Sequence, residues 1–362
     1  MKIAILGTRG IPSNYGGFET FAEQLAVRLV DRGHQVTVYC RSHYISSRLK
    51  EYKGVRLIVL PTIKHKYLDT VVHTFISIFH CLFHDYQIVL ICNGVNALCS
   101  FIPRLRGQKV IINVDGLERQ RKKWNRLGKL VYMISEWLVT FLPDAIVSDS
   151  LFIQKYYRDR YNKASTYIAY GGDLGEVVRD GKVNKYKLEK NRYILFVGRL
   201  EPENNAHLVQ KAFINLKTDL KLVFLGDAPY GKKYIDKLKE IQDNRILFLG
   251  AIYGEDYRQL LDDCYFSVRA SEVGGTHPAL LEAMGYGKCV LVSDNPQNRE
   301  TAGSACMLFR LKDKNDLKTK LQYLIDNPSI VKEYGEKAKE RIAKYYTWDK
   351  VTDAYERLFK NV

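Results

Sequence analysis

The stretch "GTRGIPSNYGGFETF", residues 7–21, places four glycines between a short apolar segment, "KIAIL" (2–6), and a helical pattern over residues 18–32. Glycines at such a junction let backbone N–H groups approach a phosphate, and the following helix adds its positive end. The spacing is neither G-x-G-x-x-G nor that of a P-loop with its lysine, which disfavours both of those sites. We predict instead that Gly16 and Gly17 let the chain approach a sugar or a diphosphate; a structural tight turn is the alternative.

Short β-branched runs alternate with helical patterns along the chain, which predicts parallel sheets covered by helices on both faces. At 362 residues the chain exceeds the roughly 250–300 residues of a single core, so two domains are expected. We predict an α/β fold of two doubly wound, Rossmann-like domains facing a central cleft, where open α/β sheets bind ligands. The predicted parts are a first domain over 1–172, a linker over 173–191, a second domain over 192–343, and a C-terminal helix over 344–362. This last helix is expected to cross back to the first domain; packing on the second domain alone is the alternative.

The charge of the chain indicates a polyanionic partner. The 56 Lys and Arg against 40 Asp and Glu give a net charge of +16, which suits nucleic acid, anionic lipid or phosphorylated substrates. No RNP, KH or zinc-finger pattern supports nucleic acid. Seven cysteines without a C-x-x-C pair argue for a reducing compartment, and "MKIAILG" lacks the features of a secretory signal, so a cytoplasmic location is expected.

The densest basic run is "RQRKKWNRLGK", residues 119–129, with six basic residues, no acid and one tryptophan. This composition suits an anionic membrane surface, and a solvated helix face is an equally weighted alternative. The flanking segments 67–83 and 130–143 are predicted to be amphipathic helices, too interrupted by polar residues to span a membrane. Most of their apolar surface is expected to be buried in the domain core rather than inserted into lipid. The candidate acceptor- and membrane-contacting residues are Asp115, Arg119, Arg121, Lys122, Lys123 and Trp124.

A second motif, "GRLEPENN" (198–205), follows a predicted strand. The planar guanidinium of Arg199 at the strand end can hold diphosphate oxygens. Glu203 and Asn204 then open the next helix, where capping by Asn204 or Asn205 is the alternative to a binding role.

A third motif, "SEVGGTHPALLEAMGYGKCVLVSD" (271–294), ends a strand in two glycines and begins a helix at residues 276–278. Free N–H groups at this helix start are predicted to face the cleft. Glu282 lies about two turns into the helix. Its carboxylate is well placed to accept both hydroxyls of a ribose; a solvated helix residue is the alternative.

Because these motifs occur together and in order, the chain resembles the GT-B glycosyltransferases of family 4, and within them the bacterial rhamnosyltransferases of cell-wall and capsular polysaccharide synthesis. The resemblance covers residues 7–300 and also rests on "NVDGLERQRKKW", "YIAYGGD" and "NRE". It implies a donor-binding set of Gly16, Gly17, Arg199, Glu203, Asn204, Gly275, Thr276, His277 and Glu282. It implies a catalytic set of Asp149, Tyr170 and Arg199.

The chain departs from the family pattern at three places, and the last two leave donor and acceptor identity open. Many family 4 members have a glutamate at the position of Gly274, although the rhamnosyltransferase subgroup shares the glycine. Ser271-Glu272 stands where a histidine is expected, and Arg119 replaces the usual tryptophan.

The resemblance implies a retaining hexosyltransferase that uses no metal or other cofactor. The implied donor is dTDP-L-rhamnose, and the implied acceptor is a polyprenyl-diphosphate-linked saccharide at the inner face of the plasma membrane. UDP-linked hexoses or N-acetylhexosamines are the alternative donors. An inverting reaction would need a carboxylate base, for which Asp115 and Asp149 are candidates. Two other classes of function are a regulator that binds sugar nucleotides without turnover and a nucleic-acid-binding protein.

Overall fold

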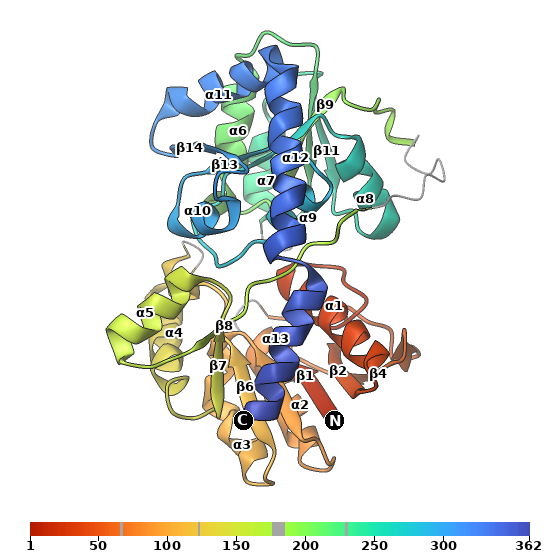
Figure 1. Cartoon of the computed structure of the whole chain (residues 1–362), viewed down its shortest axis with the longest axis vertical. Helices are drawn as coiled ribbons and strands as arrows, with labels where there is room; N and C mark the ends of the chain where they lie inside the picture. The colour runs from red at the N-terminus through yellow and green to blue at the C-terminus, as the bar shows by residue number, and fades with distance from the viewer. Residues whose placement is uncertain (66–67, 122–123, 176–184, 229–230) are drawn as a thin grey trace. The chain divides into compact units, whose positions relative to one another are not determined.

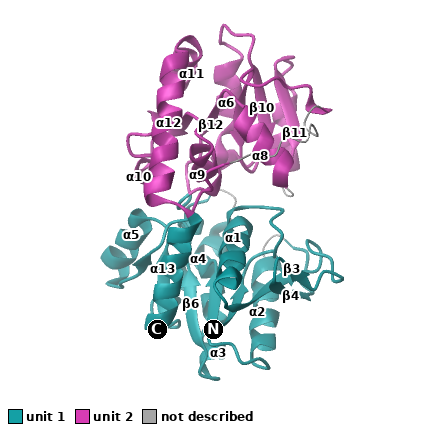
Figure 2. Ribbon diagram, turned by 45° about the vertical axis from the view of Figure 1, so that its right-hand side comes forward, with its two compact units in different colours: residues 1–170, 274–276, 348–362 teal, residues 171–273, 277–347 magenta. Residues whose placement is uncertain are grey.

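The computed structural model describes residues 1–65, 68–121, 124–175, 185–228 and 231–362, which form two compact units (Figures 1 and 2). Unit 1 comprises residues 1–170, 274–276 and 348–362, and unit 2 comprises residues 171–273 and 277–347. Each unit has its own β-sheet, so the predicted pair of parallel-sheet α/β domains is confirmed. Part of the predicted linker, residues 176–184, lies outside the described residues.

Unit 1 has an eight-stranded sheet of order β3-β4-β2-β1-β5-β6-β7-β8, in which β3 and β4 alone among these strands pair antiparallel. Its central strands are buried on both faces, which explains their continuous apolar sequences. The order reverses at β1, so the loop that follows β1 lies at the topological switch point. The elements are β1 (Lys2–Leu6), α1 (Gly17–Asp31), β2 (Gln35–Arg41), β3 (Glu51–Tyr52), β4 (Val55–Leu60), α2 (Asp69–Cys81), β5 (Ile88–Cys92), η1 (Gly94–Cys99), α3 (Phe101–Arg104), β6 (Lys109–Asn113), η2 (Glu118–Gln120), α4 (Arg126–Leu138), β7 (Ala145–Ser148), α5 (Leu151–Tyr161), β8 (Thr166–Tyr167) and α13 (Trp348–Asn361).

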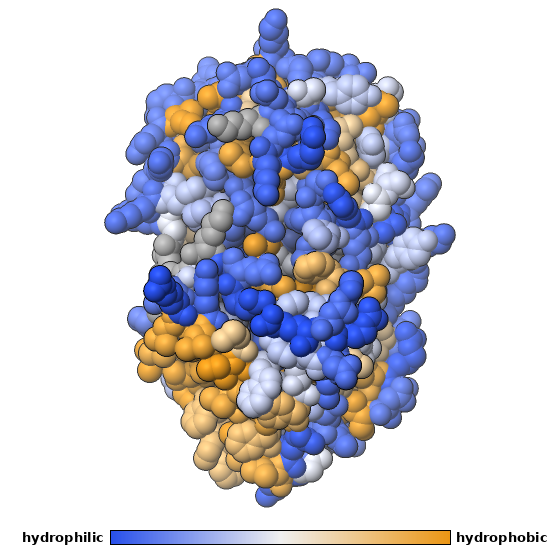
Figure 3. All heavy atoms as spheres, turned by 90° about the vertical axis from the view of Figure 1, so that its left-hand side faces the viewer, coloured by the Kyte–Doolittle hydropathy of each residue, from blue (hydrophilic) through white to orange (hydrophobic). Residues whose placement is uncertain are grey.

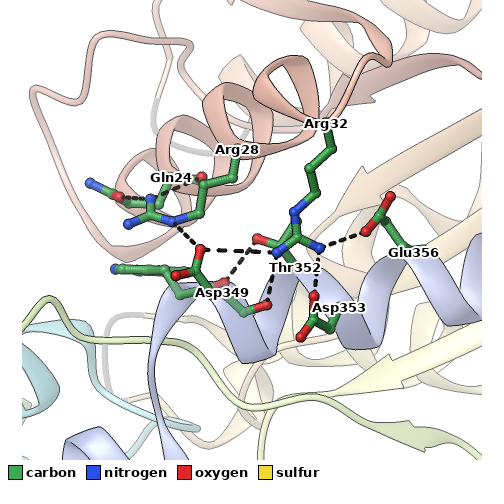
Figure 4. Close-up of polar contacts among 8 residues, drawn as sticks. Gln24, Arg28, Arg32, Asp349, Thr352, Asp353 and Glu356 are labelled. Carbon is green, nitrogen blue, oxygen red and sulfur yellow. Dashed lines mark hydrogen bonds and ion pairs between the residues drawn. The ribbon is translucent and has the colours of Figure 1, made fainter.

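The C-terminal helix α13 packs against α1 within unit 1 (Figure 4). Arg32 donates hydrogen bonds to Asp353 at 2.6 Å and Glu356 at 2.5 Å, and Arg28 lies 3.3 Å from Asp349. The opposite side of α13 is apolar and buried, and its aromatic core residues are Trp348, Tyr355 and Phe359. Apolar burial therefore anchors the helix, and the half-exposed ion pairs orient it.

Unit 2 has a six-stranded parallel sheet of order β11-β10-β9-β12-β13-β14. Its order reverses at β9, which pairs with β10 on one side and β12 on the other. The elements are β9 (Tyr193–Val197), η4 (Pro202–Asn204), α6 (Ala206–Phe213), β10 (Lys221–Leu225), α7 (Lys232–Lys239), β11 (Ile246–Gly250), α8 (Gly254–Asp263), β12 (Phe266–Arg269), α9 (Pro278–Gly285), β13 (Val290–Ser293), α10 (Pro296–Ala302), β14 (Met307–Phe309), α11 (Lys314–Asp326) and α12 (Pro328–Tyr345).

One expectation about unit 1 is wrong. The segments 67–83 and 130–143 contain helices α2 and α4 as predicted, but much of their apolar surface is exposed instead of buried in the core. The positions that face the interior are largely polar, for example Ser77 on α2 and Glu136 on α4. The larger apolar side chains are consequently on the outside.

Candidate active site

The loops that follow β9 and β12 meet in unit 2 because these two strands are neighbours in a parallel sheet. Several contacts join the loops: the N–H of Glu272 donates to the carbonyl of Glu203 at 2.9 Å, and Asn205 Nδ2 donates to the carbonyl of Ala270 at 2.9 Å. Since the strand order reverses at β9, this edge is where a doubly wound sheet binds its ligand. The second and third motifs of the sequence therefore form one cluster.

The first loop of this cluster holds Arg199 at the end of β9. Its guanidinium is partly exposed, with Nη1 3.7 Å from Glu201 Oε2. Asn204 Nδ2 donates to the Arg199 carbonyl at 2.7 Å, which fixes the backbone beside the guanidinium. The alternative that Asn204 or Asn205 caps the next helix through its side chain is wrong, since α6 begins after Asn205 without a side-chain cap. Glu203, in the same loop, is buried.

The second loop adds Arg269, which the sequence analysis missed. Arg269 Nη2 lies 2.9 Å from His277 Nδ1, and His277 Nε2 lies 3.1 Å from Ser271 Oγ. Because a guanidinium only donates, Nδ1 must accept, so the proton of a neutral imidazole sits on Nε2 and is donated to Ser271. Arg269 ends strand β12, where a sequence pattern could have marked it only as a charge at a strand end.

Glu282 lies on helix α9, which starts at Pro278 with His277 as its N-cap. Its Oε2 accepts a hydrogen bond of 2.7 Å from the hydroxyl of Tyr257, a second residue that the sequence analysis missed. Desolvation by burial raises the pKa of the Glu282 carboxyl, and burial also raises the pKa of the Tyr257 hydroxyl well above its usual value. Tyr257 therefore remains a donor. The arrangement places an oriented carboxylate in the same unit as Arg199 and Arg269.

Residues 274–276, the glycine-containing start of the third motif, belong to unit 1, where they contact Asp149. The Thr276 N–H donates to Asp149 Oδ2 at 2.6 Å, and a Cβ on Gly275 would lie only 1.9 Å from that oxygen. The prediction that the Thr276 N–H is free for a ligand is therefore wrong. Asp149 is fully buried, and a buried carboxylate requires hydrogen-bond donors. Gly275 is needed for this close approach.

The remaining unit 1 candidates gather near the switch point at β1. Tyr170 is buried against Phe18 and Phe21, and its hydroxyl lies 3.5 Å from Asp115 Oδ1. Gly16 precedes α1 and Gly17 is its first residue. The extended backbone of Gly16, with φ −168°, is open to any residue, and an added Cβ would reach no atom closer than 3.5 Å. Packing among the described residues therefore does not require glycine at position 16. A binding role for Gly16 and Gly17 stays a prediction.

Three side chains of the basic run make contacts with other residues of the protein, which the sequence analysis did not predict. Arg119 pairs with Glu136 at 3.1 Å and donates to Tyr156, while Arg121 is buried and pairs with Glu118. The Trp124 ring packs on Tyr132 with ring centroids 5.0 Å apart. Lys122 and Lys123 lie outside the described residues. A role of these residues toward an acceptor or a membrane stays a prediction.

Two family models match the chain. Residues 178–341 match "Glycosyl transferases group 1", and residues 1–173 match a domain of unknown function, DUF1972. Among the described residues no group of three or more His, Cys, Asp and Glu side chains is arranged to hold a metal ion.

The curated relatives with similar sequences include two bacterial sugar transferases. The chain is 30% identical over 173 residues to the N-acetylgalactosamine-N,N'-diacetylbacillosaminyl-diphospho-undecaprenol 4-alpha-N-acetylgalactosaminyltransferase of Campylobacter jejuni, covering 47% of this chain and 46% of that protein. It is 26% identical to the lipopolysaccharide 1,2-N-acetylglucosaminetransferase of Salmonella typhimurium, covering 70% of this chain and 72% of that protein. The first match thus spans less than half of the relative's length.

A solved structure matches the whole chain. The crystal structure of HepE from Anabaena in complex with UDP-glucose has a TM-score of 0.79 at 17% sequence identity, and the match covers 100% of both chains. This likeness shows the GT-B fold. The match to the model of the group 1 glycosyl transferases covers residues 178–341, which hold the Arg199, Arg269 and Glu282 cluster.

Proposed function

We propose that this protein is a glycosyltransferase that moves a sugar from a nucleoside diphosphate to a lipid-diphosphate-linked saccharide in the synthesis of a bacterial cell-surface polysaccharide. The observation that carries the proposal is the cluster at the switch point of unit 2. There two guanidinium groups, Arg199 and Arg269, lie at the ends of adjacent strands, and Glu282 follows on the next helix.

The chemistry of glycosyl transfer matches this cluster. Cleavage of a sugar–phosphate bond leaves negative charge on the departing diphosphate, and preorganised cations lower the free energy of that state. We propose that Arg199 holds the diphosphate and that Arg269, oriented by His277, adds a second positive charge. His277 is then a positioning residue, because both of its ring nitrogens are engaged by Arg269 and Ser271.

Two donors remain candidates, dTDP-L-rhamnose and a UDP-linked hexose or N-acetylhexosamine. A carboxylate that accepts both ribose hydroxyls favours UDP, because the deoxyribose of dTDP lacks the 2′-hydroxyl. The UDP-glucose bound to HepE supports the same choice. We therefore place the UDP-linked donor first and keep dTDP-L-rhamnose as the alternative.

The acceptor is proposed from the Campylobacter relative, whose name states a diphospho-undecaprenol substrate. Such a lipid would place the reaction at the inner face of the plasma membrane. We propose that the reaction retains the anomeric configuration and needs no metal, because the two guanidinium groups supply the positive charge. From the family resemblance, Gly16 and Gly17 are proposed to contact the donor diphosphate, and Asp149 and Tyr170 the reacting sugar.

The test measures release of free nucleoside diphosphate from UDP- and dTDP-sugars by the purified protein. The proposal is supported if turnover continues in the presence of a chelator and is lost in Arg199→Ala. The control is Arg310→Ala, which changes an exposed arginine of the same unit and should keep turnover. Binding of a sugar nucleotide without any release, with acceptor or water, would instead identify a regulator. NMR of the product decides the configuration, and an inverted anomer contradicts retention.

A further inference from the structure

Helix α2 is amphipathic in the opposite sense to an ordinary surface helix. Its buried side carries polar groups: Asp69 pairs with Arg41 at 2.6 Å, His73 Nε2 lies 3.0 Å from the Cys40 carbonyl, and Ser77 is fully buried. Its outer side is apolar, with exposed Leu68, Phe75 and Phe79, followed by Phe83 just past its end.

Helix α4 has the same reversed polarity. Ser135 and Glu136 are buried, and the Glu136 carboxylate accepts a hydrogen bond of 2.7 Å from the Tyr156 hydroxyl. The large apolar side chains that α4 exposes are Leu127, Leu130, Val131, Met133, Ile134 and Trp137. In water a surface helix normally turns such residues inward, so these two helices are built for an apolar surrounding on their outer side.

The exposed side chains of α2 and α4 form one surface, because η1 contacts both helices and α3 contacts α2. The segment between them adds Leu98, Phe101 and Leu105, and Phe141 follows α4. Phe83 and Leu105 are 77% and 76% exposed, the highest values among the large apolar side chains described. We call this surface, on α2, η1, α3 and α4, the outer apolar face. Figure 3 shows apolar residues gathered on one face of unit 1, in the lower part of the view.

Exposed cations accompany the outer apolar face. Besides Arg104, which pairs with Asp144, they are Arg106, Lys109, Arg126 and Lys129. Among the described residues of 68–144, Asp85 is the exposed acid. A surface cavity of about 360 Å³ is lined by residues 84–87 and 106–109, among them His84, Asp85, Arg106 and Lys109. It lies directly beside Phe83 and Leu105 in the sequence. Cationic side chains thus flank the two most exposed large apolar residues, an arrangement that suits contact with lipid phosphates.

We propose that the outer apolar face inserts into the headgroup and upper acyl region of an anionic lipid bilayer. A second copy of the chain fits the charges poorly, because a twofold contact would bring the same cations together. No described helix is long and apolar enough to pass through a bilayer. The proposed association with the membrane is therefore peripheral. Lipid binding follows from the exposed side chains alone; only its use in reaching a lipid-linked acceptor rests on the proposed function.

The test is flotation of the full chain with vesicles of phosphatidylcholine, with and without phosphatidylglycerol, in the absence of donor and acceptor. The double variant Phe79→Ser/Phe83→Ser is compared with Ile214→Ser/Tyr323→Ser, which removes two exposed apolar side chains from unit 2. We expect the wild type and the control to bind, and the first variant to lose at least about tenfold in partition coefficient. Arg106→Gln/Lys109→Gln should lose the preference for phosphatidylglycerol while keeping weaker binding to both vesicles.

Three results would overturn the inference: a wild type that does not float with anionic vesicles, equal binding by Phe79→Ser/Phe83→Ser, or a lipid-free dimer that this variant dissociates. Unfolding midpoints and nucleoside diphosphate binding of each variant show that it is folded. Failure of catalysis with intact flotation would count against the proposed function alone, and failure of flotation with intact nucleotide-sugar hydrolysis would count against the membrane face alone.

Discussion

Glu282→Gln tests the assignment of the unit 2 cluster as a nucleotide site. The substitution removes a charge but keeps the shape of the side chain, and its amide oxygen can still accept the 2.7 Å hydrogen bond from Tyr257. The free protein should therefore keep its fold. Its stability should not fall, because burial already raises the pKa of this carboxyl and a neutral amide avoids that desolvation cost.

The expected loss in ligand binding follows from the type of hydrogen bond. A hydroxyl bonded to a carboxylate contributes about 1.5–3 kcal/mol, and one bonded to a neutral amide about 0.5–1.5 kcal/mol. The difference of about 1–1.5 kcal/mol corresponds to roughly tenfold weaker binding. Oε2 is engaged by Tyr257, so a hydrogen bond from the 2′-hydroxyl of the ribose to Oε1 alone accounts for a loss of this size. A second hydroxyl would add to it.

Isothermal titration with UDP, dTDP and inorganic pyrophosphate provides the measurement. Glu282→Gln should weaken the binding of UDP about tenfold and the binding of dTDP less. Pyrophosphate binding should not change, since pyrophosphate has no ribose. Glu333→Gln, which changes an exposed glutamate of α12, is the control and should leave all three unchanged. If the variant bound UDP and pyrophosphate equally more weakly, or bound UDP as tightly as the wild type, the assignment of Glu282 to the ribose would be refuted.

Three further predictions concern unit 1. Gly275→Ala should destabilise the protein by about 1–3 kcal/mol, because its Cβ would lie 1.9 Å from Asp149 Oδ2; an unchanged midpoint in chemical denaturation would contradict this contact. Tyr355→Phe should cost about 1–3 kcal/mol in free energy of unfolding, because it leaves the buried Asn113 amide without the hydroxyl that now accepts its 2.9 Å hydrogen bond. Burial lowers the pKa of His73 to about 4 from an ordinary value of 6.5. As the pH drops from 6.5 to 4, the His73 imidazole is protonated in the unfolded chain but stays neutral in the folded protein, so the free energy of unfolding falls. Denaturant unfolding should show the advantage of the wild type over His73→Gln shrinking by about 3 kcal/mol across that range, and a constant difference would show that His73 does not titrate in this way.

Much of the candidate site could be predicted because its chemistry lies in continuous motifs. Arg199 and Glu282 each stand in a stretch whose strand, loop and helix are readable locally, and the structure places both in unit 2. Arg269 and Tyr257 could not be found in this way. They become relevant only through their contacts with His277 and Glu282, and those contacts depend on which strands and helices are neighbours.

The prediction that the Thr276 N–H is free was wrong for a related reason. A helix start has unpaired donors in any sequence that forms one, but whether a ligand or the protein satisfies them depends on what lies opposite. Here Asp149, distant in the sequence, accepts the Thr276 N–H. The reversed polarity of α2 and α4 escaped prediction as well, because periodicity shows that a helix has two different sides without showing which side faces the core.

The amino-acid sequence alone determined that the chain forms two parallel α/β sheets, since strand-length apolar runs and helical periods are local properties of the chain. It also determined the glycine-rich and cationic motifs at the strand ends. Tertiary structure decided the order of the strands, and with it which strand ends became neighbours. It also decided which polar groups the protein satisfies internally and which apolar side chains remain outside. These depend on contacts between residues far apart in the chain, which no local pattern contains.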